Sequence, residues 1–168
     1  MSYYFRYDYT IKKGVHIMKH QTKPSFTLVG KSILIEGTTV HEHHYSKEKT
    51  AFYTQLFKEG MLGKLMPHSL DKRGYALIVP HKDGIQYYAG VAANDAVAGY
   101  ESILVPEKDY LVSSASGDKS RLLFDKLEDN FFEGEYSSLY NDGIILEILL
   151  NGNPMDAEVE LWVPNSTN

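Results

Sequence analysis

The chain has 168 residues and no cysteine; 43% of its residues are hydrophobic and 23% are charged. This composition is typical of a soluble protein with one domain, or with two small fused halves around one core. The lack of cysteine excludes disulfides, thiolate chemistry and cysteine-based zinc sites. No apolar run reaches the roughly 20 residues that span a bilayer, and no signal peptide is recognisable, so we expect a cytoplasmic protein that does not enter a membrane.

The net charge of −5 is unevenly distributed along the chain. Residues 1–17 carry +2, so the remaining residues carry −7. An acidic body disfavours direct nucleic-acid binding, which depends on neutralising phosphates, and mildly favours cationic ligands. The 13 tyrosines are typical of half-buried strands. Tyrosines that face a cavity would give it amphipathic walls that tolerate cations.

Residues 1–24 show neither helical nor alternating periodicity. The codons for residues 12–15 can contain a ribosome-binding sequence a short distance before Met18. We therefore expect Met18 to be the natural start of translation and residues 1–17 to be a translated leader, and we leave that segment out of the fold prediction. The domain would then span residues 18–168.

The first half of this domain, about residues 25–95, predicts three strands and one helix. Apolar runs rich in strand-forming residues at 25–37, 74–80 and 85–93 predict the strands. Asp83-Gly84 between the last two runs predicts a hairpin.

The helix of the first half is expected to begin at Ser46 or Lys47. Its apolar side chains have helical spacing, and two glycines mark its end. The apolar set is Phe52, Leu56 and Phe57, with Tyr53 alongside, and the glycines are Gly60 and Gly63.

The second half, about residues 100–165, repeats this order. Strands are predicted at 100–106, 109–116, 143–150 and 157–164, and a helix at 118–134. The apolar stripe of this helix is Leu122, Leu123, Leu127 and Phe131. Because "FTLV" and "FKEG" of the first half match "YLVS" and "FFEG" of the second, we expect an α+β fold built from two related halves.

Strand alternation predicts which side chains face the helices. In the last strand the aliphatic set Val159, Leu161 and Val163 should pack on the helices, and Glu158, Glu160 and Trp162 should face away. In residues 143–150 the same reasoning turns Ile144, Leu146, Ile148 and Leu150 toward the helices and Ile145, Glu147 and Leu149 away from them. In residues 85–93 it turns Gln86, Tyr88, Gly90 and Ala92 away. A sheet face with Ile, Leu, Tyr and Trp around one carboxylate is typical of a pocket wall.

The presence of Glu147 in an apolar strand requires an explanation, because burying a carboxylate without a partner costs free energy. One interpretation is structural: the residue lies at a sheet edge or pairs with a lysine. The other is functional: the carboxylate is kept for a cationic ligand.

The ordered series "FTLVG", a helix with aromatic residues, "GYALIV", "YYAGV", a second helix and "ELWVPN" resembles the GyrI-like effector-binding domains. These domains also occur as C-terminal sensor modules of AraC- and MerR-type regulators. The resemblance covers about residues 19–165. It implies two βαββ halves related by a pseudo-twofold axis, an SHS2-type duplication with a ligand cleft between the halves.

The resemblance also implies a ligand site. Glu147 matches a glutamate at the base of an aromatic cleft in members that bind many drugs, and Trp162 matches an aromatic residue of the cleft wall. Tyr53 stands where the family usually has a tryptophan on the first helix. The remaining candidates are Tyr75, Tyr87, Tyr88 and Glu160; family spacing favours Tyr87 over Tyr88, whereas strand alternation favours Tyr88.

The function implied is binding of lipophilic, cationic aromatic compounds in an aromatic cleft, as a free-standing sensor linked to transcription regulation through an unknown protein partner. No helix-turn-helix is recognisable, so we expect no direct nucleic-acid binding. We expect no cofactor, metal or catalytic residue. The alternatives are a hydrolase of cyclopropanoid genotoxins, with Glu147 or Glu160 as general base, and a gyrase inhibitor.

The loop "VHEHHYS" at 40–46 contains His41, Glu42, His43 and His44. It resembles the zinc motif H-E-x-x-H only superficially, because Tyr45 stands at the last ligand position and the setting is a loop. We expect a solvated loop.

Overall fold

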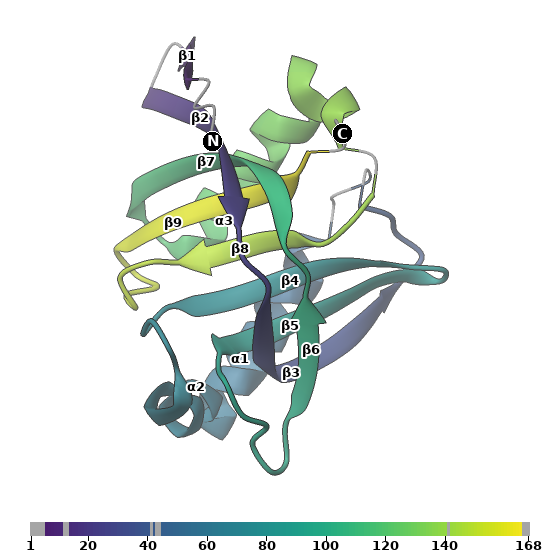
Figure 1. Cartoon of the computed structure of the whole chain (residues 1–168), viewed down its shortest axis with the longest axis vertical. Coiled ribbons are helices and arrows are strands. Elements are labelled where there is room, and N and C mark those ends of the chain that lie inside the picture. The colour runs from purple at the N-terminus through teal and green to yellow at the C-terminus, as the bar shows by residue number, and fades with distance from the viewer. Residues whose placement is uncertain (1–5, 12–13, 41, 43–44, 141, 166–168) are drawn as a thin grey trace.

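The computed structural model describes residues 6–11, 14–40, 42, 45–140 and 142–165. These residues form one antiparallel nine-stranded sheet with helices on one face (Figure 1). The strands are β1 (Arg6–Ile11), β2 (Gly14–Lys23), β3 (Phe26–Glu36), β4 (Gly74–His81), β5 (Gly84–Ala92), β6 (Glu101–Val105), β7 (Lys108–Asp118), β8 (Ile145–Leu149) and β9 (Ala157–Pro164). The helices are α1 (Ser46–Glu59), α2 (Met61–Leu65) and α3 (Ser120–Phe132), and short 3₁₀ turns cover Met66–His68 and Glu135–Leu139.

The strand order β1-β2-β7-β9-β8-β4-β5-β3-β6 confirms the two βαββ halves. The first half is β3-α1-β4-β5 and the second is β7-α3-β8-β9. The two halves meet where β4 pairs with β8, with Leu77 opposite Leu146. Going outward from this junction, the order β4, β5, β3 on one side mirrors β8, β9, β7 on the other.

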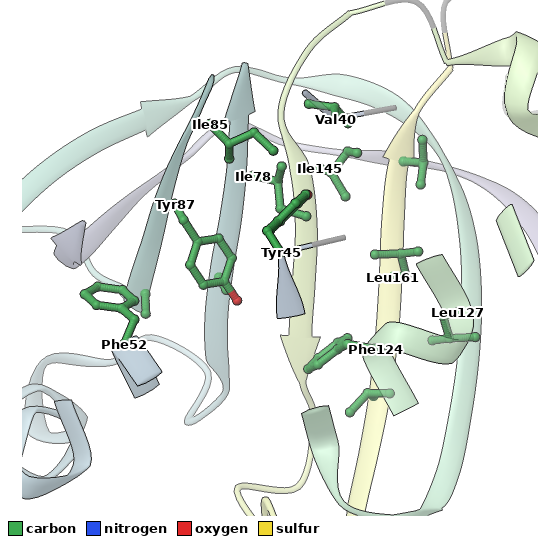
Figure 2. Close-up of a cluster of buried hydrophobic side chains, with 14 of the residues drawn as sticks. Val40, Tyr45, Phe52, Ile78, Ile85, Tyr87, Phe124, Leu127, Ile145 and Leu161 are labelled. Carbon is green, nitrogen blue, oxygen red and sulfur yellow. The ribbon is translucent and has the colours of Figure 1, made fainter. Parts of the chain in front are cut away.

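Both faces of the sheet are buried, so the protein has two apolar cores. One core lies between the sheet and α1, α2 and α3. It contains Phe52 of α1 together with strand residues such as Ile78 and Leu161 (Figure 2). The opposite face has a core of its own, made of Leu28, Tyr75, Leu77, Ala92, Val105, Tyr110, Val112, Leu146, Ile148 and Trp162. In Figure 1, α3 lies behind β7, β8 and β9, and α1 lies behind the other half.

The helices match the predicted segments, but one residue of each predicted stripe is exposed. Phe57 is 83% exposed and Leu122 is 55% exposed. Phe57 follows the buried Leu56 and is turned about 100° around the helix, which carries it off the side that touches the sheet. The prediction that these two side chains join the apolar stripe was wrong. Gly60 ends α1 in the left-handed conformation, as predicted.

The predicted orientation of the strand at 143–150 was also wrong. Ile145 and Leu149 belong to the helix-face core, and Leu146 and Ile148 belong to the opposite face. Glu147 of β8 lies directly opposite Leu161 of β9, and directly opposed residues on neighbouring strands share a face of the sheet. Because Leu161 belongs to the helix-face core, Glu147 also points toward the helices. Side-chain alternation gave the wrong orientation because β8 is apolar on both faces, so no set of polar residues marked a solvent-facing side.

The strands β3 and β5 approach each other closely at two glycines. Gly30 pairs with Gly90, and a Cβ atom at Gly90 would overlap the carbonyl oxygen of Val29. Only glycine fits there without moving a backbone strand.

We therefore expect Gly90→Ala to lower the free energy of unfolding by about 1–3 kcal/mol, the usual cost of overpacking. Gly63→Ala is the matched control, because a Cβ atom there meets nothing within 4 Å. It should leave stability unchanged or raise it by up to about 1 kcal/mol, since Gly63 is helical. Urea denaturation followed by circular dichroism measures both variants. Equal stability of Gly90→Ala and wild type would contradict the packing argument.

Candidate functional site

Glu147 is the centre of a buried cluster of charges at the junction of the halves. The residue is 1% exposed, and both of its carboxylate oxygens have partners. The Tyr87 hydroxyl donates to Oε1 at 2.5 Å. Lys49 Nζ lies 3.1 Å from Oε2, and the Arg121 guanidinium reaches Oε1 at 3.3 Å and Oε2 at 3.4 Å. The carboxylate is therefore held by one hydroxyl and two cations.

The cluster is assembled from both halves of the fold. Glu147 is in β8 and Arg121 is in the first turn of α3, whereas Lys49 is in the first turn of α1 and Tyr87 is in β5. Figure 2 shows Tyr87 on β5 with its ring directed toward the space between the helices, near Phe52 and Tyr45. The sheet junction thus brings the helix N-terminal turns of the two halves to one carboxylate.

Lys49 is the innermost cation. It is 1% exposed, and its ammonium also contacts both oxygens of Glu128, at 2.8 and 3.1 Å. The ammonium lies over the rings of Tyr45 and Tyr87, 4.6 and 5.2 Å from their centroids. Two carboxylates and two rings replace the water that burial removes from this ammonium.

Arg121 is the outer cation and is held more loosely. Its guanidinium lies 5.5 Å from the ring centroid of Tyr53 and 5.4 Å from that of Phe124. It also contacts Asp125 at 3.5 Å. Its side chain is 16% exposed, and its buried Nε has no hydrogen-bond partner among the described residues.

The pKa values of the two buried glutamates are shifted in opposite directions. Burial opposes ionisation of Glu147, but Arg121 and Lys49 outweigh it and hold the pKa of Glu147 below its ordinary value. Burial, opposed by Lys49 and reinforced by the charge of Glu147, raises the pKa of Glu128 well above its ordinary value. Glu147 therefore carries the negative charge of the pair.

The two tyrosines beside Glu147 stay protonated. Burial and the charge of Glu147 raise the pKa of Tyr53 to about 12 and that of Tyr87 well above its ordinary value. Their hydroxyl oxygens are 3.5 Å apart. Tyr87 thus acts as a fixed donor to the carboxylate, and Tyr53 supplies an aromatic wall beside Arg121.

The seven candidate residues do not form one site. Glu147, Tyr53 and Tyr87 meet on the helix face, and Tyr87 rather than Tyr88 is the tyrosine that contacts Glu147. The other four lie on the opposite face of the sheet. These are Tyr75, Tyr88, Glu160 and Trp162, with Trp162 Nε1 donating to Glu160 at 3.3 Å.

Sequence reasoning missed three charged members of the cluster: Lys49, Arg121 and Glu128. Lys49 precedes Phe52 by three residues, and Glu128 follows Phe124 by four, so both lie in register with a buried helix stripe. A charged residue at a buried position of a helix is the sequence signal that could have identified Lys49 and Glu128.

A depression of about 320 Å³ opens beside Tyr45, whose ring contacts Lys49. It is lined by Ile35, Glu36, Gly37, Thr38, Glu42, Tyr45 and Glu48. Three of these residues are acidic, which favours cations at this surface.

The described part of the chain contains no group of three or more potential metal ligands. His41, His43 and His44 of the predicted solvated loop lie outside the described residues. Within the described residues, no helix combines the length and apolarity that crossing a bilayer requires.

The class of protein follows from a sequence match to a family of effector-binding proteins. Residues 21–164 match the family model of the Cass2 integron-associated effector binding proteins, and the chain belongs to that family. No curated protein sequence matches the chain.

Solved structures share the fold at low sequence identity. SAV2435 bound to tetraphenylphosphonium is 20% identical with a TM-score of 0.76, over 89% of this chain and 93% of that one. The Vibrio cholerae integron cassette protein VCH_CASS2 is 15% identical with a TM-score of 0.55, over 98% and 99%. The EcmrR C-terminal domain is 12% identical with a TM-score of 0.54, over 91% and 99%.

Lys49→Met should destabilise the protein strongly, because it removes the buried ammonium that contacts both Glu128 and Glu147 and leaves Glu147 with Arg121 as its one cation among the described residues. We expect a loss of about 3–5 kcal/mol near neutral pH, as for other broken buried ion pairs. Lys47→Met on the exposed side of the same helix is the control and should change stability by less than about 0.5 kcal/mol. Thermal and urea denaturation of both variants measure this; equal effects would contradict a structural role of Lys49.

Glu147→Gln should change the response of stability to acid. The lowered pKa of Glu147 adds stability that is present above its ordinary value of 4.5 and is lost as pH falls toward the folded-state pKa. Wild type should therefore lose more stability than Glu147→Gln between about pH 5 and pH 3. Urea denaturation at several pH values tests this, with Glu158→Gln, at an exposed position of β9, as control. Parallel curves for wild type and Glu147→Gln would show that Glu147 is not ionised in the folded state.

Proposed function

We propose that this protein binds lipophilic aromatic cations on the helix face, and that the ligand takes the place of Arg121 beside Glu147. The site would consist of the Glu147 carboxylate, the rings of Tyr53 and Phe124, and the fixed donor Tyr87. Such binding fits a small-molecule sensor, whose output would pass through a protein partner.

The observation that carries this proposal is the environment of Arg121. A guanidinium is planar, delocalised and weakly hydrated, so among side chains it is the nearest analogue of an aromatic cation. Here it lies between Tyr53 and Phe124 and faces both oxygens of Glu147. The chain thus fills this position with a group of the same chemistry as the proposed ligand.

Arg121 is also the cation that can leave. Its contacts with Glu147 are 3.3 and 3.4 Å long, whereas Lys49 is closer to both of its carboxylates and is fully enclosed. Asp125, 3.5 Å from Arg121 and 31% exposed, offers the guanidinium a partner nearer to water. If a ligand replaced Arg121, the ligand would pair with Glu147 and Arg121 would pair with Asp125, so no charge would be left without a partner.

The family and the shared fold support the class of ligand. The protein belongs to an effector-binding family, and SAV2435, which has the same fold, is described with tetraphenylphosphonium bound. Tetraphenylphosphonium combines one positive charge with four aromatic rings, and rings stack on tyrosine and phenylalanine with few directional demands.

Titration with tetraphenylphosphonium in a calorimeter tests the proposal through two opposite variants. Glu147→Gln should weaken binding by about tenfold or more, because the ligand loses its counter-charge in a water-poor site. Arg121→Ala should strengthen binding, by a factor on the order of 3–30, because no internal cation competes.

Glu158→Gln removes one exposed negative charge from the neighbouring strand and should bind as wild type does. Circular dichroism confirms that each variant is folded before titration. Equal affinity of wild type and Glu147→Gln, or weaker binding by Arg121→Ala, would contradict the exchange of Arg121 for a ligand.

A further inference from the structure

A second cation is enclosed by aromatic rings on the opposite face of the sheet. The Lys23 ammonium lies 5.2 Å from the ring centroid of Phe26, 5.6 Å from that of Tyr75 and 5.2 Å from that of Trp162. A single significant cation–π contact occurs about once in 70–80 residues, so three rings around one ammonium are unusual. We call Phe26, Tyr75 and Trp162 the aromatic cage.

The cage is built from strands of both halves and is held in place by contacts other than Lys23. Phe26 begins β3, Tyr75 is in β4 and Trp162 is in β9. Trp162 donates to Glu160 at 3.3 Å, and the Tyr75 hydroxyl donates to Asp71 at 2.5 Å. The rings of Phe26 and Tyr75 also contact each other, with centroids 5.2 Å apart. A site fixed in this way loses little conformational entropy when it binds.

Lys23 is a poor chemical match for this cage. No hydrogen bond or salt bridge holds its ammonium among the residues that the structure describes. Asp71 and Glu160 attract it from a distance, but burial outweighs them and lowers the pKa of Lys23. A primary ammonium has three N–H donors, and the faces of three rings satisfy them less well than water does.

We propose that the aromatic cage is a binding site for compact quaternary ammonium groups, and that Lys23 is its displaceable internal occupant. A quaternary ammonium carries the charge that rings attract and has no N–H donors to leave unsatisfied. Asp71 and Glu160 supply negative charge near the cage without touching the cation, against the single positive charge of Arg73. Lys23 is only partly buried at the end of β2, and Pro24 and Ser25 after it are exposed, so a change of side-chain rotamer can bring its ammonium to water.

This site is independent of the one proposed at Glu147. The sheet separates the two, since Glu147 points toward the helices and Trp162 belongs to the core of the opposite face. The two differ in ligand as well: the cage suits a small, round cation, whereas Tyr53 and Phe124 suit a large aromatic one.

Fluorescence of Trp162, the single tryptophan of the chain, reports directly on the cage. Titration of wild type with tetramethylammonium chloride, against sodium chloride at equal ionic strength, should give a saturable change. Lys23→Ala should bind tetramethylammonium about 3–30-fold more tightly, because the internal competitor is gone. Lys19→Ala, another lysine of β2 with an exposed side chain, is the matched control and should bind as wild type does.

Two further measurements make the assignment falsifiable. Phe26→Leu keeps an apolar side chain at a half-buried position and should weaken binding, whereas Glu133→Gln, an exposed position at the end of α3, should leave it unchanged. 3,3-Dimethyl-1-butanol, an uncharged molecule of the same shape, should bind far more weakly than tetramethylammonium. The proposal is overturned if Lys23→Ala binds no more tightly than wild type, if the uncharged molecule binds equally well, or if no variant gives a saturable signal.

Discussion

The Glu147 carboxylate must be neutralised where β4 meets β8, and much of the structure serves that requirement. An isolated charge at this depth would be too costly to keep. Each half contributes one cation from the first turn of its helix, Lys49 from α1 and Arg121 from α3. The charge cluster therefore connects the first turns of both helices to one carboxylate at the junction of the halves.

The two faces of the sheet share one arrangement, a cation from the chain itself surrounded by aromatic rings. On the helix face the cation is Arg121 between Tyr53 and Phe124, and on the opposite face it is Lys23 in the aromatic cage. Each internal cation provides a positive charge to the rings and carboxylates around it. If the two proposed ligands bind, each would have to displace one of these side chains, which would lower its apparent affinity.

Much of the fold could be predicted from the sequence because its signals are local. The Asp83-Gly84 signal marks a hairpin whose turn is formed by Lys82 and Asp83, with Gly84 beginning β5. Gly60 ends α1 through its left-handed conformation, and repeated strand and helix patterns reveal the duplication. Only part of the candidate site could be predicted. Tyr53, Tyr87 and Glu147 were recognised, but Tyr75 and Trp162 were assigned to the same cleft although they lie on the other face. Alternation fails in a strand such as β8, which is apolar on both sides.

The sequence by itself determined the two βαββ halves, the positions of their turns and the presence of one acid within an apolar strand, because these depend on periodicity and on turn residues along the chain. Only the tertiary structure decided what that acid contacts. Lys49 and Tyr87 are 98 and 60 residues from Glu147 in the chain. They reach it only because the pairing of β4 with β8 places the two halves side by side, and the free energy of that pairing comes from many apolar contacts that no single motif encodes.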